Sequence, residues 1–155
     1  MNEDQAKALR NLVRAQDTAA LGTLHDGDPF VSMVPYAQAV DGDFYIHVSR
    51  LATHTRDMLA SPRVSLLIVA PDADTPQSRA RVTVQGDAYL LDREAAEYAD
   101  ARAGYIARFP HAADIFEFAD FSLFRIAPVS ARVVGGFAQA YSLGGESFVR
   151  AMRGG

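Results

Sequence analysis

Residues 44–69 read FYIHVSRLATHTRDMLASPRVSLLIV. The two apolar runs at the ends of this segment predict strands, and the polar stretch between them predicts a short helix. Ser49 closes the first strand, and Thr55 and Arg56 lie in the first turn of the helix. The N-terminus of a helix presents unpaired N–H groups and a partial positive charge. Because hydroxyl and guanidinium donors lie beside that terminus, the segment predicts a site for an anion such as a phosphate monoester.

Further elements are predicted on either side of this segment. Apolar residues recur at helical spacing near the N-terminus, where Asn2 is a candidate N-cap. Residues 25–28 (HDGD) are typical of a hairpin turn, and Gly86 marks a bulge within a long alternating run. Strands are therefore expected at residues 18–24, 29–36, 44–49, 63–70, 79–91, 121–127 and 131–140, helices at 3–16, 53–60, 93–108 and 111–119, and a partly helical tail after 142.

The balance of these elements predicts a mainly β fold. A chain of 155 residues favours one domain, here spanning residues 1–155. Short turns between successive strands predict antiparallel pairing, and six to seven strands with few helices predict a split or closed β-barrel with flanking helices. Closure of the barrel, or dimerisation through one face, would protect the sheet edges.

The composition excludes several classes of function. The chain has no cysteine, which excludes disulfides, thiolate metal sites and cysteine catalysis, and the spacing of its four histidines predicts no metal site. A net charge of −4 argues against a nucleic-acid partner. We find no apolar run long enough to span a membrane and no signal-peptide pattern at the N-terminus, so a cytoplasmic protein without membrane attachment is expected.

The order of these elements resembles the FMN-binding split barrels related to pyridoxamine 5′-phosphate oxidase. The resemblance covers residues 5–145 and is carried by the segment at 44–69, by ALGTLHDGDPFVSMVPYA (residues 20–37) and by RVTVQGDAYLL (residues 81–91). The closing segment DFSLFRIAPVSARVVGGFAQAYSL (residues 120–143) is most similar to the haem-utilisation branch of this superfamily, with its Phe-Arg-Ile-x-Pro and Gly-Gly-Phe-x-x-Ala patterns.

The resemblance implies a homodimer that binds FMN at the interface between its subunits. It implies that the FMN phosphate is held by the first turn of the short helix, that the second strand lies along the flavin ring, and that a partner subunit adds one glutamine. The expected cofactor-binding residues are therefore Ser32, Met33, Val34, Pro35, Val48, Ser49, His54, Thr55, Arg56, Gln85 and Gln139.

The chain departs from the classical vitamin B6 oxidases of this family. Those enzymes have a basic run on the second strand and a Trp-Arg motif near the end, whereas residues 29–36 lack Arg and Lys and the chain has no Trp. Vitamin B6 oxidation is therefore not expected. Some members of the haem-utilisation branch use a late histidine as iron ligand, and no histidine follows His111.

Three functions remain open at this stage. The main expectation is an FMN-dependent oxidoreductase that acts on an unidentified small molecule. The alternative is a haem-binding or haem-degrading protein that places haem at the dimer cleft, and the third is a flavin-binding module without catalysis. No residue stands out as a general acid or base.

Overall fold

The computed structural model describes residues 1–136 and 139–154 of the chain. Its elements are α1 (Glu3–Ala15), β1 (Thr18–His25), β2 (Asp28–Pro35), β3 (Ala37–Gln38), β4 (Phe44–Ser49), α2 (Thr53–Ala60), β5 (Arg63–Val69), η1 (Pro76–Ser78), β6 (Arg81–Leu90), α3 (Tyr98–Arg108), η2 (Pro110–Ala113), η3 (Ile115–Glu117), β7 (Phe121–Val134), β8 (Ala140–Gly144) and α4 (Gly145–Arg153).

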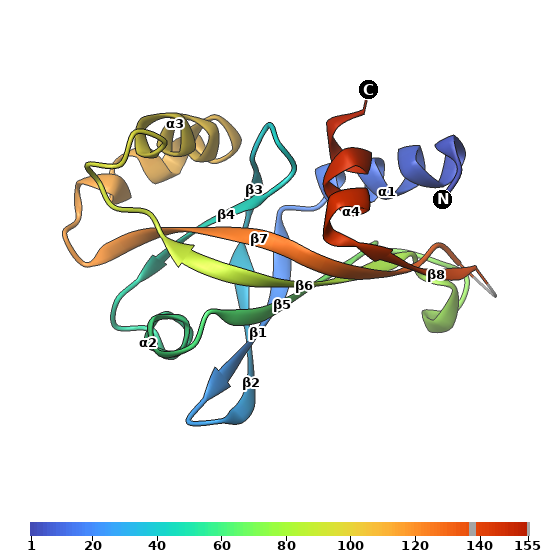
Figure 1. Cartoon of the computed structure of the whole chain (residues 1–155), viewed down its shortest axis with the longest axis horizontal. Helices are drawn as coiled ribbons and strands as arrows, with labels where there is room; N and C mark the ends of the chain where they lie inside the picture. Colours follow the sequence, from blue (N-terminus) through green and yellow to red (C-terminus); the bar gives the residue numbers. More distant parts are fainter. Residues whose placement is uncertain (137–138, 155) are drawn as a thin grey trace.

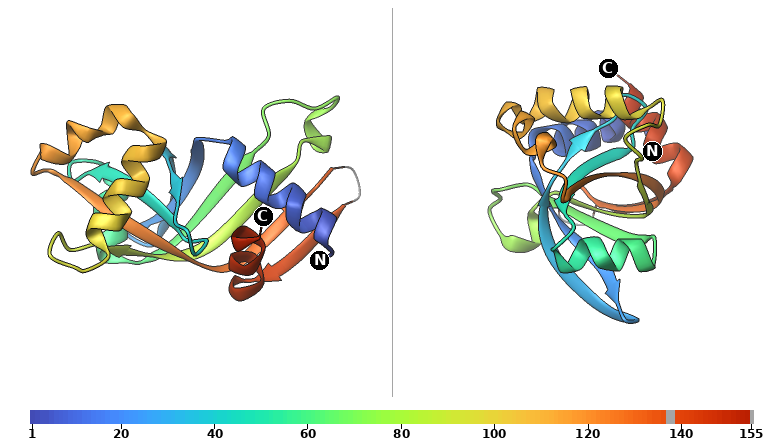
Figure 2. Two further views of the ribbon diagram at one scale, coloured as in Figure 1. Left: turned by 90° about the horizontal axis from the view of Figure 1, so that it is seen from above. Right: turned by 90° about the vertical axis from the view of Figure 1, so that its left-hand side faces the viewer.

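The strands form one antiparallel sheet that curls into a half-barrel. Their order is β2-β1-β5-β6-β7-β4-β3, and β8 pairs with β7 to complete an eight-stranded sheet. Figure 1 shows α1, α3 and α4 on one side of the sheet and α2 on the other, beside the β1–β2 hairpin. Figure 2 shows the strands curling around a common interior. The expected mainly β, antiparallel split barrel is confirmed, with one strand more than expected.

The core lies inside the curl of the sheet, under α1 and α4. Alternate side chains of β5 and β6 point inward, and Leu66, Ile68, Val82 and Val84 have no exposed surface. The ring of Phe148 from α4 stacks on a core aromatic of β4 with ring centroids 5.9 Å apart. Period-two alternation therefore places one face of each central strand in the core and leaves the other face outside.

The β1–β2 hairpin closes through the predicted turn. Asp26 and Gly27 both adopt positive φ angles, 51° and 86°, which is the backbone of a two-residue type I′ turn. The hairpin extends beyond the rest of the sheet at its turn end (Figures 1 and 2). The predicted N-cap is also confirmed, since the Asn2 side chain accepts a hydrogen bond from the Gln5 N–H.

The strands of the C-terminal half differ from the expectation at two places. A single strand, β7, runs through Pro128, where two strands were expected, and β8 follows it. The register shifts opposite Gly86, so that Val129 has no partner in β6. A bulge of this kind lets a residue without an N–H group remain inside a strand.

The helical segment between β6 and β7 is shorter than expected. Helix α3 begins at Tyr98 instead of residue 93, because the Asp92 carboxylate accepts a hydrogen bond from the Glu94 N–H and forms a turn. Residues 111–119 form parts of two short 3₁₀ helices and not one α-helix. These segments cover a second small core at the end of β4 and β7.

Candidate ligand-binding site

The first turn of α2 meets the edge strand β2 through one polar contact. Nδ1 of His54 lies 3.1 Å from the hydroxyl oxygen of Ser32. Burial lowers the pKa of His54, and the nearby Asp57 carboxylate opposes this shift only in part. The imidazole is therefore neutral near pH 7, with one ring nitrogen held by Ser32 and Nε2 left for another partner.

The two hydroxyls expected to bind a phosphate are used inside the protein. The Thr55 side chain is fully buried and donates its hydrogen bond to the Ser49 carbonyl oxygen at 2.6 Å. The Ser49 hydroxyl accepts a hydrogen bond from the Leu51 N–H at 3.2 Å. These bonds shape the turn from β4 into α2, and Thr55 has no second proton to offer an anion.

Arg56 lies on a different face of α2 from His54. Residues two apart in a helix do not share a face, and Arg56 is exposed to solvent. Within residues 1–136 and 139–154, its side chain makes no hydrogen bond or ion pair. The guanidinium therefore remains available to an anionic group that approaches the start of α2.

Asp57, His25 and Thr23 form a cluster that was not expected from the sequence. The Asp57 side chain is only 4% exposed, although the His25 side chain beside it is 49% exposed. Thr23 donates its hydroxyl to one carboxylate oxygen at 2.8 Å, and Nδ1 of His25 lies 2.7 Å from the other. Thr23 and His25 are two residues apart on β1 and therefore lie on the same face of the strand, which is the only sequence signal for this cluster. Asp57 gives no such signal, since a polar residue in a helix is usually solvated.

The outer face of the hairpin is apolar and open. Val31 and Met33 of β2 are 68% and 66% exposed and flank Ser32 along the strand. A shallow cavity of about 250 Å³ lies between this face and β5 and β6, and Gln85 forms part of its wall. The Gln85 side chain accepts a hydrogen bond from the Ser130 hydroxyl at 3.1 Å.

The remaining expected site residues lie apart from one another. Val34 and Val48 belong to the core, with 2% and 5% of their surface exposed, and Pro35 ends β2. Gln139 lies in the connection between β7 and β8, where its N–H donates to the Gly136 carbonyl oxygen. The structure thus brings Ser32 to His54 and Ser49 to Thr55 but leaves the glutamines elsewhere in the subunit.

His47 is not on the surface or in an open site. Its ring is stacked on Phe116 with centroids 3.8 Å apart and planes 7° from parallel, and burial lowers its pKa to about 4. The alternation of His47 with Ile46 and Val48 along the strand would direct this side chain toward solvent or a dimer interface, whereas the structure shows it buried. The reason is the chain after α3, whose 3₁₀ segments fold over β4.

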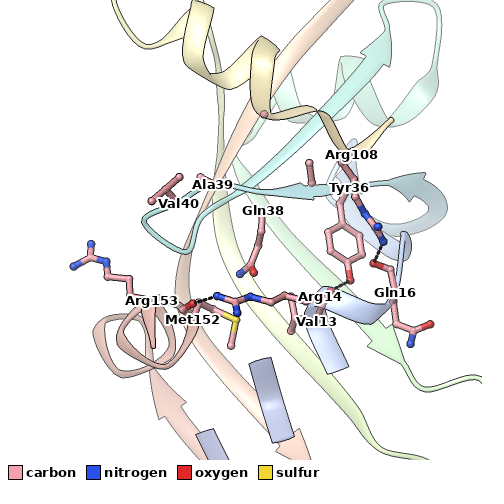
Figure 3. A pocket seen from close by; sticks show the side chains of 12 residues that line it. Val13, Arg14, Gln16, Tyr36, Gln38, Ala39, Val40, Arg108, Met152 and Arg153 are labelled. Atoms are coloured by element: carbon pink, nitrogen blue, oxygen red, sulfur yellow. Dashed lines mark hydrogen bonds between the residues drawn. The ribbon is translucent and has the colours of Figure 1, made fainter. Parts of the chain in front are cut away.

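A cavity of about 470 Å³ lies between α1, β3, α3 and α4 (Figure 3). Two of its arginines bond to carbonyl oxygens at helix ends: Arg14 donates to the Met152 carbonyl oxygen at 2.8 Å and Arg108 to that of Gln16 at 3.1 Å. None of the expected site residues lines this cavity. These bonds join α1 to α4 and α3 to the end of α1.

Among residues 1–136 and 139–154, none of the helices has the length and apolar character that a membrane-spanning segment requires. In the same residues, no group of three or more His, Asp or Glu side chains is arranged to hold a metal ion.

Known proteins similar to this chain are named for haem. The chain is 40% identical over 122 residues to the chloroplast heme oxygenase HOZ of Arabidopsis thaliana, covering 79% of this chain and 36% of that protein. It is 28% identical over 145 residues to the heme oxygenase HutZ of Vibrio cholerae, covering 91% and 82%. A heme binding protein from Mycobacterium smegmatis has a solved structure that matches with a TM-score of 0.86 and 33% identity, covering 94% of this chain and 60% of that chain.

These relatives correct the expected cofactor. All three are named for haem and none for a flavin, so the prediction of FMN, and with it that of a flavoprotein oxidoreductase, is wrong. The resemblance to the haem-utilisation branch is confirmed. The chain spans about a third of the plant relative and about three fifths of the mycobacterial one.

The family itself is shown by a match along most of the chain. Residues 5–135 match the family model described as pyridoxamine 5′-phosphate oxidase. This range begins in α1 and ends just after β7, so it includes the hairpin, α2 and the central strands. The chain therefore belongs to the pyridoxamine 5′-phosphate oxidase family.

Proposed function

We propose that this protein binds haem and that haem is its substrate for oxidative breakdown. The observation that carries the proposal is the 40% identity, over 79% of the chain, to a protein named as a heme oxygenase. The structure supports it with a neutral histidine and an unpaired arginine at the start of α2. Both are chemically suited to haem, which presents an iron atom and two carboxylates around a flat apolar ring.

His54 is the proposed ligand of the haem iron. Metal-binding imidazoles must be neutral and are usually oriented by a hydrogen bond at the second ring nitrogen. Burial keeps His54 neutral, and Ser32 supplies that hydrogen bond at 3.1 Å. Two of the other three histidines are less suited, because His47 is stacked within the protein and His25 is paired with the Asp57 carboxylate.

Arg56 is the proposed partner of a haem propionate. It is exposed and follows His54 by two residues, so it can reach a carboxylate at the rim of a ring whose iron is near His54. Arginine binds carboxylates through two parallel hydrogen bonds, which suits a propionate group. The two side chains would then contact haem at different points, because they lie on different faces of α2.

We further propose that two copies of the chain enclose the haem. His54 lines none of five cavities formed by the described residues, and we propose that one subunit alone leaves the ring open to water. The outer face of the hairpin, with Val31 and Met33 exposed, is the apolar surface that a second copy would cover. Gln139 is retained as a proposed contact from the second copy, and Gln85 as a proposed polar contact to the ligand.

Haem titration with matched variants tests this proposal. Haemin added to the protein should give a stoichiometric Soret band typical of histidine-ligated iron, and His54→Ala should remove that spectrum, whereas His111→Ala should not. Arg56→Ala should weaken haem binding about fivefold by removing one exposed charge-assisted contact. It should leave binding of haem dimethyl ester unchanged, because the ester carries no carboxylates.

Breakdown is tested separately from binding. With oxygen and ascorbate, the Soret band of the complex should decay and a ring-opened tetrapyrrole should accumulate, and His54→Ala should slow this decay. A protein that binds haem and leaves it intact under these conditions would contradict the catalytic part of the proposal only. A protein that binds no haem would contradict both parts.

A further inference from the structure

A buried carboxylate joins α2 to the β1–β2 hairpin. The Asp57 side chain is 4% exposed and accepts hydrogen bonds from both Thr23 and His25, at 2.8 and 2.7 Å. An ionised carboxylate in such a position is stabilised only while those donors remain in place. The cluster therefore fixes the position of α2 against β1 more strictly than apolar packing alone would.

The same face of α2 carries the proposed iron ligand. Asp57 follows His54 by three residues, and residues three apart lie on one side of a helix. His54 contacts Ser32 on β2, while Asp57 contacts Thr23 and His25 on β1. Helix α2 is thus attached to both strands of the hairpin, and the position of His54 depends on both attachments.

We infer that Asp57 is a positioning residue for haem binding, and that the proton on His25 regulates it by strengthening or weakening the attachment of α2 to the hairpin. This inference rests on the proposed function, because it concerns how tightly the same site binds haem. It adds a regulation of haem affinity by pH to the proposed binding of haem.

Three charged groups face the imidazole of His25. Asp57 comes from α2, and Asp26 from the hairpin turn lies 3.7 Å from Nε2, so both favour the protonated ring, whereas Arg56 opposes it. The hydrogen bond to Asp57 is the largest cause that raises the pKa of His25. Burial raises the pKa of Asp57, but the hydrogen bonds from His25 and Thr23 outweigh it and lower that pKa below its usual value.

These shifts give the direction of the effect. Because the pKa of His25 is raised in the folded protein, the ion pair is complete below the usual histidine pKa of about 6.5 and is lost as the pH rises through the raised value. Asp57 loses its negative charge only in acid, because its pKa is lowered. Haem affinity should therefore fall as the pH rises above neutrality, over a range in which His54 is already neutral.

The test measures the haem dissociation constant at pH 6 and pH 8.5. The wild-type protein should bind about threefold more weakly at pH 8.5, since a half-exposed ion pair makes a modest contribution. His25→Gln, whose amide still donates a hydrogen bond but does not titrate, should show no such change. Thr23→Val should weaken binding by the same factor at both pH values, and the control His111→Gln should behave as wild type.

A second readout separates this inference from the proposed function. Hydrogen-exchange protection of residues 53–60 should fall between pH 6 and pH 8.5 in the wild-type protein without haem, and it should be independent of pH in His25→Gln. Equal pH dependence in these two proteins, in either measurement, would overturn the inference. If no haem binds at all, the proposed function fails, and hydrogen exchange alone decides whether the His25–Asp57 pair positions α2.

Discussion

Replacing Gly86 by alanine tests the bulge that joins β6 to β7. A Cβ atom at this position would lie 2.6 Å from the carbonyl oxygen of Ala127 and 3.1 Å from a methyl carbon of Ile126. The closest atom belongs to the backbone of a central strand, so it cannot rotate away. Overpacking of this kind costs about 1–3 kcal/mol of the free energy of unfolding. At about 3 °C per kcal/mol for a chain of this length, Tm should fall by about 3–9 °C.

The same substitution at Gly104 is the matched control. Gly104 lies within α3, and a Cβ atom there would meet no atom within 4 Å. Gly104→Ala should therefore stabilise the protein by about 0.5–1 kcal/mol, through helix propensity alone. Thermal melts followed by circular dichroism measure both variants. If Gly86→Ala melts at or above the wild-type temperature, the close approach of β6 and β7 at the bulge is refuted.

Three further predictions concern buried and half-buried polar side chains. The wild-type protein should lose stability as the pH falls from 6.5 to 4, because the lowered pKa of His47, about 4, makes the unfolded chain bind the proton first, and His47→Phe should remove this loss. The same pH dependence of the free energy of unfolding in both proteins, measured by urea melts, would contradict this. Arg125→Met should cost about 1–3 kcal/mol by leaving Asp43 without its ion pair, and adding Asp43→Asn should recover part of that loss in chemical denaturation. Thr55→Val should cost about 1–2 kcal/mol through the lost bond to the Ser49 carbonyl but leave haem affinity within twofold; a larger loss of affinity would place Thr55 in the site.

The segment at 44–69 folds as its pattern predicts. Strand β4 and helix α2 have the expected bounds, and β5 ends one residue early. This agreement has a local cause, because apolar alternation stops at Ser49 and Ser61-Pro62 ends the helix. Sequence patterns within a few residues were therefore sufficient to predict these three elements.

The errors in the predicted fold come from interactions between distant residues. Pro128 normally interrupts a strand, and only the bulge opposite Gly86 allows β7 to continue through it. The burial of His47 depends on the fold of residues 110–117 over β4. The sequence around Pro128 does not identify Gly86 as its partner, and the sequence around His47 does not identify residues 110–117.

The candidate site was predictable only in part. Ser32 and His54 were both expected to bind a ligand, but their contact joins β2 to α2 across 22 residues. Asp57 was not expected, because an acidic residue in a helix is usually solvated and its two donors lie on another strand. The ligand could not be derived from an anion site alone, since FMN and haem both carry anionic groups.

The most direct test of the central claim is a titration of the purified protein with haemin, followed by absorbance spectroscopy. We predict saturable binding with a Soret band of histidine-ligated iron that is lost in His54→Ala and kept in His111→Ala. Absence of a Soret shift in the wild-type protein would contradict haem binding. An unchanged spectrum in His54→Ala would contradict the site at the start of α2.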